Sequence, residues 1–288
     1  MKKIVLYSLL LMGVISFAQE KEKRNQEKMQ NKGKAYFYWG WNRSFYSNSD
    51  ITFEGDDYNF TLDNVIADDR QDEVNTDYVN PGRITIPQTN MRIGYFFHDN
   101  WNISFGIDHM KYVMRPYQEV TINGEINNGT QYDGIYNNDK ITLDPDFLSF
   151  EHTDGLNYVN IEVNRFDRLN DLFNFYIKHV DISLTEGLGV GMLYPKTNTR
   201  LMDNERYDEF HLSGYGVSAK AGLNITFFKY VFIQSECKVG YINMPDIRTT
   251  QSSSDSASQD FTFLQGNIVF GGRFPICNPK KKEKVPTE

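Results

Sequence analysis

The sequence predicts an all-β fold, an eight-stranded antiparallel up-and-down transmembrane β-barrel with long extracellular loops. Three observations lead to it. Apolar and polar residues alternate in eight stretches between Gly33 and Phe274, short and long connections alternate between those stretches, and the chain begins like an exported protein. Strands of about ten residues with this alternation are typical of barrels that cross a membrane.

The alternation is clearest between residues 180 and 194. Val180, Ile182, Leu184, Leu188, Val190, Met192 and Tyr194 fall on one parity, and residues such as Asp181, Ser183, Thr185, Gly187 and Gly189 fall on the other. Successive side chains of a strand point to opposite faces. One face is therefore apolar and suited to lipid, and the other is polar.

Eight strands are expected in chain order. Their predicted ranges are 34–46, 88–97, 101–113, 157–166, 176–194, 211–227, 230–242 and 261–274. Every odd-numbered connection is long and every even-numbered one is short, as in barrels with short periplasmic turns and long surface loops. Both ends of the barrel domain, residues 34–274, are therefore expected on the periplasmic side.

The N-terminus has the features of a secretory signal. Lys2 and Lys3 precede an apolar run from Ile4 to Val14, and a small residue, Ala18, stands at a plausible cleavage point. We expect a signal peptide over residues 1–18 and a flexible periplasmic leader over 19–33. Residues 275–288 are expected to form a short periplasmic tail.

Composition narrows the function classes. Loss of Lys2 and Lys3 with the signal takes the formal net charge from −8 to −10, and ten carboxylates against Arg70 alone lie between Asp50 and Asp77. No basic footprint for nucleic acid is present. The aromatic fraction is 15% although the mean hydropathy is −0.55. A barrel reconciles these values, because only every second strand residue meets lipid.

The parity opposite to the apolar face identifies eight charged lumen residues, four bases and four acids. They are Arg92, Asp108, Glu162, Asp181, Lys220, Glu236, Lys238 and Arg273. An eight-stranded barrel is just wide enough for side chains to fill it. Enclosed charges are costly unless they are paired, so these residues are interpreted as a salt-bridge network that plugs the lumen.

The whole mature chain resembles the small outer-membrane β-barrel proteins of Gram-negative bacteria, the OmpA/OmpW-like eight-stranded class. The resemblance lies in the architecture and in strands such as Gly187-Leu188-Gly189-Val190-Gly191. The Ala18-Gln19 junction and the composition, rich in Asn, Lys and Tyr, look like a member from the Bacteroidota. Such families include adhesins, envelope stabilisers, carriers and lipid-modifying enzymes, and the fold does not choose among them.

One spacing suggests catalysis. His211-Leu212-Ser213 is similar to the His-x-Ser pair of the lipid A 3-O-deacylase family, in which a base activates a serine. That family has an acidic residue a dozen positions after the serine, where this chain has Ile225, so Glu151 or Asp154 would have to substitute. Strand parity also predicts that Ser213 faces lipid. The preferred interpretation is an ordinary rim histidine beside a small residue.

Two loop regions offer further candidates. His152 lies between Glu151 and Asp154 in a segment that is apolar enough to fold back on the molecule, and it could support a base or bind a cation. Metal candidates in the first loop are Asp56, Asp57, Asp68 and Asp69, although no EF-hand spacing is present and a solvated loop is preferred. The aromatic residues Phe53, Tyr58, Phe60 and Tyr78 either form a binding surface or pack on one another.

These patterns predict a monomeric protein of the cell outer membrane with a closed lumen. It acts, without enzymatic activity, through its extracellular loops as a surface or envelope protein. A lipid-modifying hydrolase and a small-molecule carrier are the alternatives. No cofactor and no bound metal are expected. The expected partners are outer-membrane lipid and lipopolysaccharide, with an extracellular ligand or surface protein as a further possibility and no nucleic acid.

Overall fold

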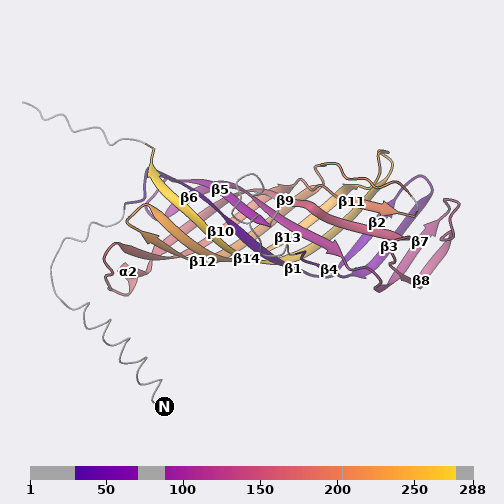
Figure 1. The fold of residues 1–288 in the computed structure, drawn as a ribbon, viewed down its shortest axis with the longest axis horizontal. Helices are drawn as coiled ribbons and strands as arrows, with labels where there is room; N and C mark the ends of the chain where they lie inside the picture. The colour runs from indigo at the N-terminus through magenta and orange to yellow at the C-terminus, as the bar shows by residue number, and fades with distance from the viewer. Residues whose placement is uncertain (1–29, 71–87, 203, 277–288) are drawn as a thin grey trace, which may run out of the picture.

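Eight long strands form a closed ring in the computed structural model, which describes residues 30–70, 88–202 and 204–276. The ring runs β1, β5, β6, β9, β10, β12, β13, β14, and β1 pairs with β14 to close it (Figure 1). Every pairing in the ring is antiparallel. The predicted eight-stranded barrel is therefore confirmed.

The ring strands follow the predicted ranges, but three of them are clearly longer. They are β1 (Lys34–Tyr46), β5 (Thr89–Phe96), β6 (Trp101–Met114), β9 (Leu148–Arg168), β10 (Val180–Leu193), β12 (Gly214–Phe227), β13 (Val231–Arg248) and β14 (Ser256–Pro275). The main differences are that β9 begins nine residues before the predicted Asn157, that β13 continues past Ile242 and that β14 begins at Ser256 instead of Phe261. A short helix, α2 (Leu169–Leu172), lies in the connection from β9 to β10.

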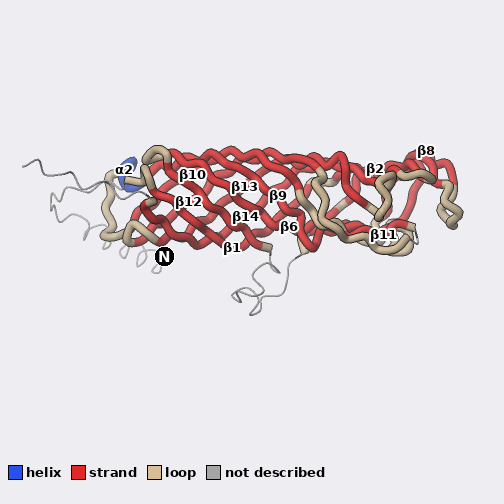
Figure 2. Tube along the Cα trace, turned by 90° about the horizontal axis from the view of Figure 1, so that it is seen from above, coloured by secondary structure: helices blue, strands red, loops and turns tan. Residues whose placement is uncertain are grey.

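The predicted long loops are partly β-structure. Six further strands occur there: β2 (Ser49–Glu54), β3 (Tyr58–Val65), β4 (Ala67–Asp68), β7 (Glu119–Ile126), β8 (Gly134–Thr142) and β11 (Asn198–Leu201). β2 pairs with β14, and β3, β7 and β8 follow it in order, while β11 pairs with β9 and β4 with β6. We call these strands, with the adjoining ends of β6, β9, β13 and β14, the extension (Figure 2).

The extension has its own hydrophobic core. Phe53 of β2 packs edge-on against Phe150 of β9 at 5.7 Å between ring centroids, and Phe60 of β3 lies 5.8 Å from Phe147. Because β2 and β3 are not hydrogen-bonded neighbours of β9, these contacts join two layers of sheet. Phe53, Tyr58 and Phe60 are all buried. Self-packing is thus the role of these aromatics, while Tyr78 lies outside the described residues.

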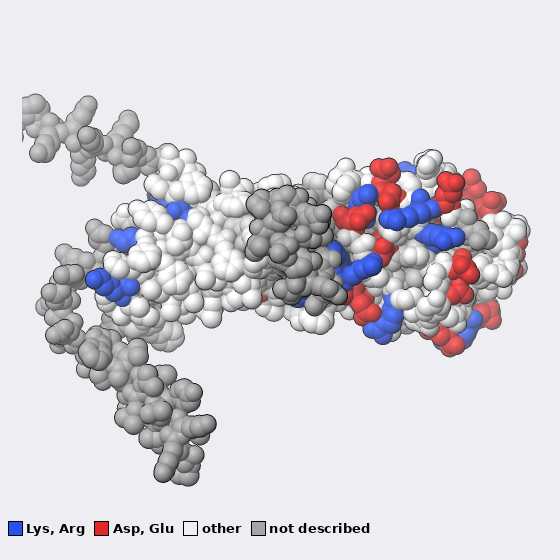
Figure 3. All heavy atoms as spheres, viewed as in Figure 1, with Lys and Arg blue, Asp and Glu red and all other residues white. Residues whose placement is uncertain are grey.

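The barrel is distinctly different at its two ends. The short turns and the described chain ends, near residues 30 and 276, lie at the end that carries α2, which we call the turn end, and the extension lies at the other (Figure 1). Between them, the outward side chains are mostly apolar, including Ile103, Phe105, Ile161 and Val190. Charged residues gather on the extension in Figure 3, whereas the visible barrel wall carries almost none.

Within the described ranges no helix is long and apolar enough to cross a membrane.

Candidate functional site

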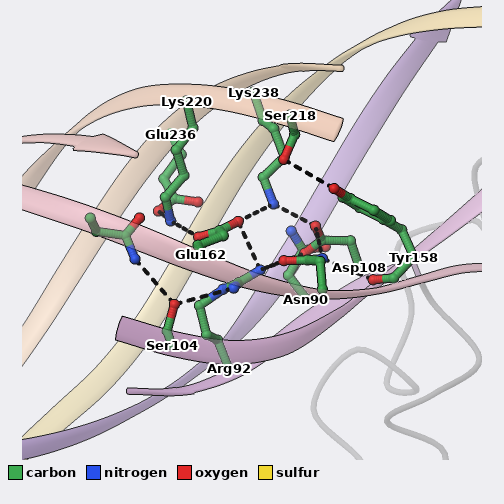
Figure 4. Close-up of polar contacts among 12 residues, drawn as sticks. Asn90, Arg92, Ser104, Asp108, Tyr158, Glu162, Ser218, Lys220, Glu236 and Lys238 are labelled. Atoms are coloured by element: carbon green, nitrogen blue, oxygen red, sulfur yellow. Dashed lines mark hydrogen bonds and ion pairs between the residues drawn. The ribbon is translucent and has the colours of Figure 1, made fainter. Parts of the chain in front are cut away.

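The lumen holds the main concentration of buried charge. Arg92 of β5, Lys220 of β12 and Lys238 of β13 meet Asp108 of β6, Glu162 of β9 and Glu236 of β13, and we call these six residues the lumen cluster (Figure 4). All six are buried. They come from five strands around the ring, so the cluster ties opposite walls of the barrel together.

Glu162 is the centre of the lumen cluster because it contacts all three bases. Its carboxylate oxygens lie 2.9 Å from Arg92 Nη2, 2.8 Å from Lys220 Nζ and 2.9 Å from Lys238 Nζ. Lys220 Nζ also lies 2.7 Å from Glu236, and Lys238 pairs with Asp108. Three positive and three negative groups therefore balance one another where water is scarce, which buried charges require.

Uncharged side chains add hydrogen bonds to the cluster. Arg92 Nε donates to Tyr38 at 3.0 Å and Nη2 donates to Asn160 at 2.8 Å, while Asn160 in turn donates to Asp108 at 3.1 Å. Asn267 donates to Glu236 at 3.3 Å. None of these residues was predicted from the sequence, although they share the inward parity that identified the charged ones.

The glycines of the Gly187–Gly191 strand make room for this chemistry. A Cβ atom on Gly187 would lie 2.1 Å from Asn164 Oδ1, and one on Gly189 would lie 2.7 Å from Ser218 Oγ and 3.0 Å from Glu162 Cγ. A side chain at either position would displace the residues that surround the lumen cluster. This repeat of glycines thus follows from the filling of the lumen.

Two of the eight predicted lumen residues lie apart from the cluster. Arg273 stacks its guanidinium against Phe96, Phe166 and Phe232 at 5.2 to 5.3 Å from the ring centroids, and it donates to Asn224 at 3.0 Å. Asp181 pairs with Arg168 near the turn end. The barrel interior therefore holds an aromatic layer around Arg273 in addition to the ionic layer.

The extension end holds the histidine candidates, and the structure separates them. His152 is buried in the extension core, where Nδ1 lies 2.9 Å from Thr197 Oγ1 and Nε2 lies 3.0 Å from Gln259 Nε2. Burial lowers its pKa to about 3. This imidazole is neutral, and both its nitrogens have amide or hydroxyl partners.

His211 and Ser213 do not form a base–nucleophile pair. His211 Nε2 lies 2.9 Å from Asp246 Oδ2, so the acidic partner is Asp246, and Glu151 and Asp154 contact Arg70 and Lys196 instead. Ser213 Oγ donates to the main-chain oxygen of His211 at 3.4 Å. Ser213 is buried, so the prediction that it faces lipid is wrong. β12 begins only at Gly214, and strand parity does not extend back to Ser213.

The four aspartates proposed as metal ligands are dispersed. Asp68 accepts two hydrogen bonds from Arg115, and these lower the pKa of Asp68. Asp69 accepts hydrogen bonds from the Gln88 side chain and from the Ser44 main-chain amide. Asp56 and Asp57 lie exposed at the turn between β2 and β3. Across the described part of the chain, no three His, Cys, Asp or Glu residues are grouped as a metal site requires.

Comparison with known proteins finds similarity at the level of structure. No protein family matches the sequence, and no curated protein matches it. The outer membrane protein OprG of Pseudomonas aeruginosa aligns with a TM-score of 0.41 and 10% identity, over 85% of this chain and 97% of OprG. The attachment invasion locus protein Ail of Yersinia pestis aligns with a TM-score of 0.33 and 11% identity, over 84% of this chain and 99% of Ail. Neisserial surface protein A aligns with a TM-score of 0.32 and 10% identity, over 85% of this chain and 100% of that protein.

Proposed function

We propose that this chain is an outer-membrane protein with a closed lumen that acts at the cell surface through its extension. The apolar outward wall between the turn end and the charged extension supports membrane insertion, since lipid favours apolar side chains on that face. In this orientation the turn end is periplasmic and the extension is extracellular. The signal-like residues 1–18 agree with export but lie outside the described residues.

The lumen cluster is the observation that carries the closed-lumen proposal. Six charged side chains cross the barrel interior and neutralise one another, and Arg273 with its three aromatic neighbours occupies the turn end. A solute or ion path through the barrel would have to break these contacts. A carrier function through the lumen therefore has no support from this geometry.

The extension is the part available to a partner. It carries most of the exposed charge of the visible face (Figure 3) and consists of strands packed around a core rather than of open loops. A rigid surface is well suited to binding, because little conformational entropy is lost when a partner docks. The hydrolase alternative is not favoured, since the Ser213 hydroxyl is buried and bonded to a main-chain carbonyl.

Bilayer recording combined with surface cleavage tests both parts of the proposal. We expect the purified protein in a planar bilayer to show no steady ohmic conductance, because the lumen cluster blocks the pore. A specific protease site inserted after Gly129, in the turn between β7 and β8, should be cut on intact cells. The matched control is the same site inserted after Phe173 at the turn end, which should be cut only in lysed cells.

Porin-like conductance of the unmodified protein would overturn the closed-lumen proposal. Equal cleavage of the two insertions on intact cells, or resistance of both, would overturn the assignment of the extension to the cell surface. Recovery of the protein in a soluble fraction without detergent would contradict membrane insertion itself.

A further inference from the structure

A carboxylate on the outer wall of the barrel has no partner within the described ranges. Glu186 lies on β10 between Leu184 and Leu188, on the face that turns outward, and it is exposed. No described residue forms an ion pair or a hydrogen bond with its side chain. Ionisable groups are disfavoured on a lipid-facing surface, so a carboxylate that remains there is a candidate for a functional contact.

A guanidinium lies beside this carboxylate on the neighbouring strand. Arg165 of β9 is directly opposite Glu186 in the strand register, and side chains opposite one another on one face are separated by about 5 Å at Cβ. Arg165 Nε donates a hydrogen bond to Asp167 at 3.0 Å. The two terminal Nη groups of Arg165 have no hydrogen-bond partner among the described residues. The wall thus presents a free carboxylate next to free guanidinium donors.

The position of this pair corresponds to the periplasmic membrane interface. Trp101, the first residue of β6 after a short turn, is directly opposite Arg165, whose guanidinium lies 5.8 Å from the Trp101 ring. Tryptophan concentrates at the level of lipid headgroups in membrane proteins. Arg165 is therefore placed where the headgroups of the inner leaflet lie, and Glu186 lies beside it on β10.

A shallow, open apolar groove begins immediately beyond Glu186 on the side of the bilayer centre. It measures about 430 Å³ and lies over β10, β12 and β13. Its lining includes Leu188, Val217, Ala219, Val239 and Tyr241. Leu188 is the next outward residue after Glu186, and the small residue directly opposite it, Ala219, leaves a depression between larger neighbours.

We propose that this face binds one phospholipid whose headgroup carries a primary ammonium, such as phosphatidylethanolamine, from the inner leaflet. The phosphate accepts hydrogen bonds from the Nη groups of Arg165, the ammonium pairs with Glu186, and one acyl chain lies in the groove. This inference rests on the membrane insertion and orientation proposed above.

The presence of both charges explains the choice of lipid. A zwitterionic headgroup carries one negative and one positive group, a partner each for Arg165 and Glu186, and charge-assisted hydrogen bonds of this kind are strong and directional. Phosphatidylglycerol has no cation for Glu186. Phosphatidylcholine has a cation but no N–H groups, so it cannot donate a hydrogen bond to the carboxylate.

Native mass spectrometry of the detergent-purified full chain, mixed with equal amounts of dioleoyl phosphatidylethanolamine and dioleoyl phosphatidylglycerol, tests the headgroup site. We expect about fivefold more of the ethanolamine adduct on the unmodified protein. Glu186→Gln should remove this preference by lowering that adduct about fivefold and leaving the glycerol adduct unchanged. The control Glu125→Gln, which changes a glutamate of β7 in the extension, should keep the preference.

A second pair of variants tests the groove. Ala219→Phe should fill the depression and lower both adducts about fivefold, whereas Ile93→Phe, an outward substitution on β5, should leave both unchanged. Heat-dependent gel mobility of each variant establishes that the barrel is folded. Equal adducts on the unmodified protein, or an unchanged preference in Glu186→Gln, would overturn the proposal. Either result would leave membrane insertion standing, because cell fractionation tests that separately.

Discussion

His152 illustrates how the same residue can be interpreted in two ways. Its neighbours Glu151 and Asp154 in the sequence suggested a ligand or base, but in the structure His152 shares the inward face of β9 with Leu148 and Phe150 and lies inside the extension core. Alternation through this segment was visible in the sequence. The depth of burial was not, because it depends on β2 and β14 packing over the segment from distant parts of the chain.

The first prediction is that His152 makes the extension less stable as the pH falls. Burial lowers its pKa from 6.5 to about 3, so between these values the unfolded chain binds a proton that the folded chain does not. The stabilising contribution is complete above pH 6.5 and is lost by about 1.4 kcal/mol for each pH unit below it. Urea unfolding of the extension, monitored by proteolysis, should show a loss of about 2 kcal/mol at pH 5 compared with pH 7.

His152→Gln should reduce this pH dependence by the same amount. The control is His98→Gln, since His98 lies exposed in the turn between β5 and β6 and should keep the dependence of the unmodified protein. A pH profile of His152→Gln identical to that of the unmodified protein would contradict the assignment of the effect to this imidazole.

Parity identified the lumen charges because the two faces of a ring strand meet different surroundings. Arg92, Glu162 and Lys238 fall on the inward parity of three strands, and in the structure they lie in one cluster. Parity does not say at which height along the barrel each side chain lies. That height depends on the stagger between strands, which is why Arg273 was grouped with residues that it does not contact.

At the scale of single elements, the largest difference from the sequence prediction is the extension. Ile51 and Phe53, and then Tyr58, Phe60 and Leu62, alternate with polar residues around the turn at Gly55 to Asp57, which is a hairpin pattern. The many acidic residues of this segment obscured the hairpin pattern, because their charges lie on the exposed face of the same strands. Pairing of β2 with β14 depends on contacts between residues about two hundred positions apart, which one sequence does not reveal.

The backbone at the free edge of the extension is irregular, which opposes pairing with strands of other molecules. β8 is the last strand of its sheet, and Asn138 within it has a φ of 57°, with a shift in register opposite Ile122 and Asn123. Asp139 also accepts a hydrogen bond from the main-chain amide of Asn137 at 2.8 Å. Irregularities of this kind protect edge strands from joining other sheets.

The second prediction concerns the core of the extension. Phe60 is fully buried between Phe53, Tyr58 and Phe147, so Phe60→Ala should destabilise the extension by about 3 to 5 kcal/mol through the cavity that it leaves. Proteolysis of the extension in urea measures this loss, and heat-dependent gel mobility reports on the barrel. The barrel should remain folded in this variant.

Phe45→Ala is the control, since Phe45 is 70% exposed and should contribute little. Simultaneous loss of both signals in Phe60→Ala would show that barrel and extension unfold together, against the expectation that the extension opens first.

At the scale of the whole molecule, the chain combines two cores of opposite character. In the barrel the charged side chains are enclosed in the lumen and the outer wall is mostly apolar, whereas the extension is apolar inside and charged outside. This inversion occurs along single strands, since β9 contributes His152 and Phe150 to one core and Glu162 to the other. The closed ring leaves no unpaired edge within the wall, which is the condition for a β-structure to span lipid.

The third prediction follows from this inversion and locates the bilayer on the molecule. Phe105 of β6 is exposed on the barrel wall with Ile93 and Ile161 directly opposite it on the neighbouring strands, so it lies within the apolar wall on three adjacent strands. Phe105→Lys should therefore lower the free energy of unfolding in phospholipid vesicles by about 2 to 4 kcal/mol, the cost of a charge near the bilayer midplane. Ile135→Lys is the matched control, because Ile135 is more exposed still but lies on β8 in the extension, where water replaces lipid and the change should stay within about 0.5 kcal/mol. Equal effects of the two substitutions in vesicles would mean that the apolar wall is not in contact with lipid, whatever its composition.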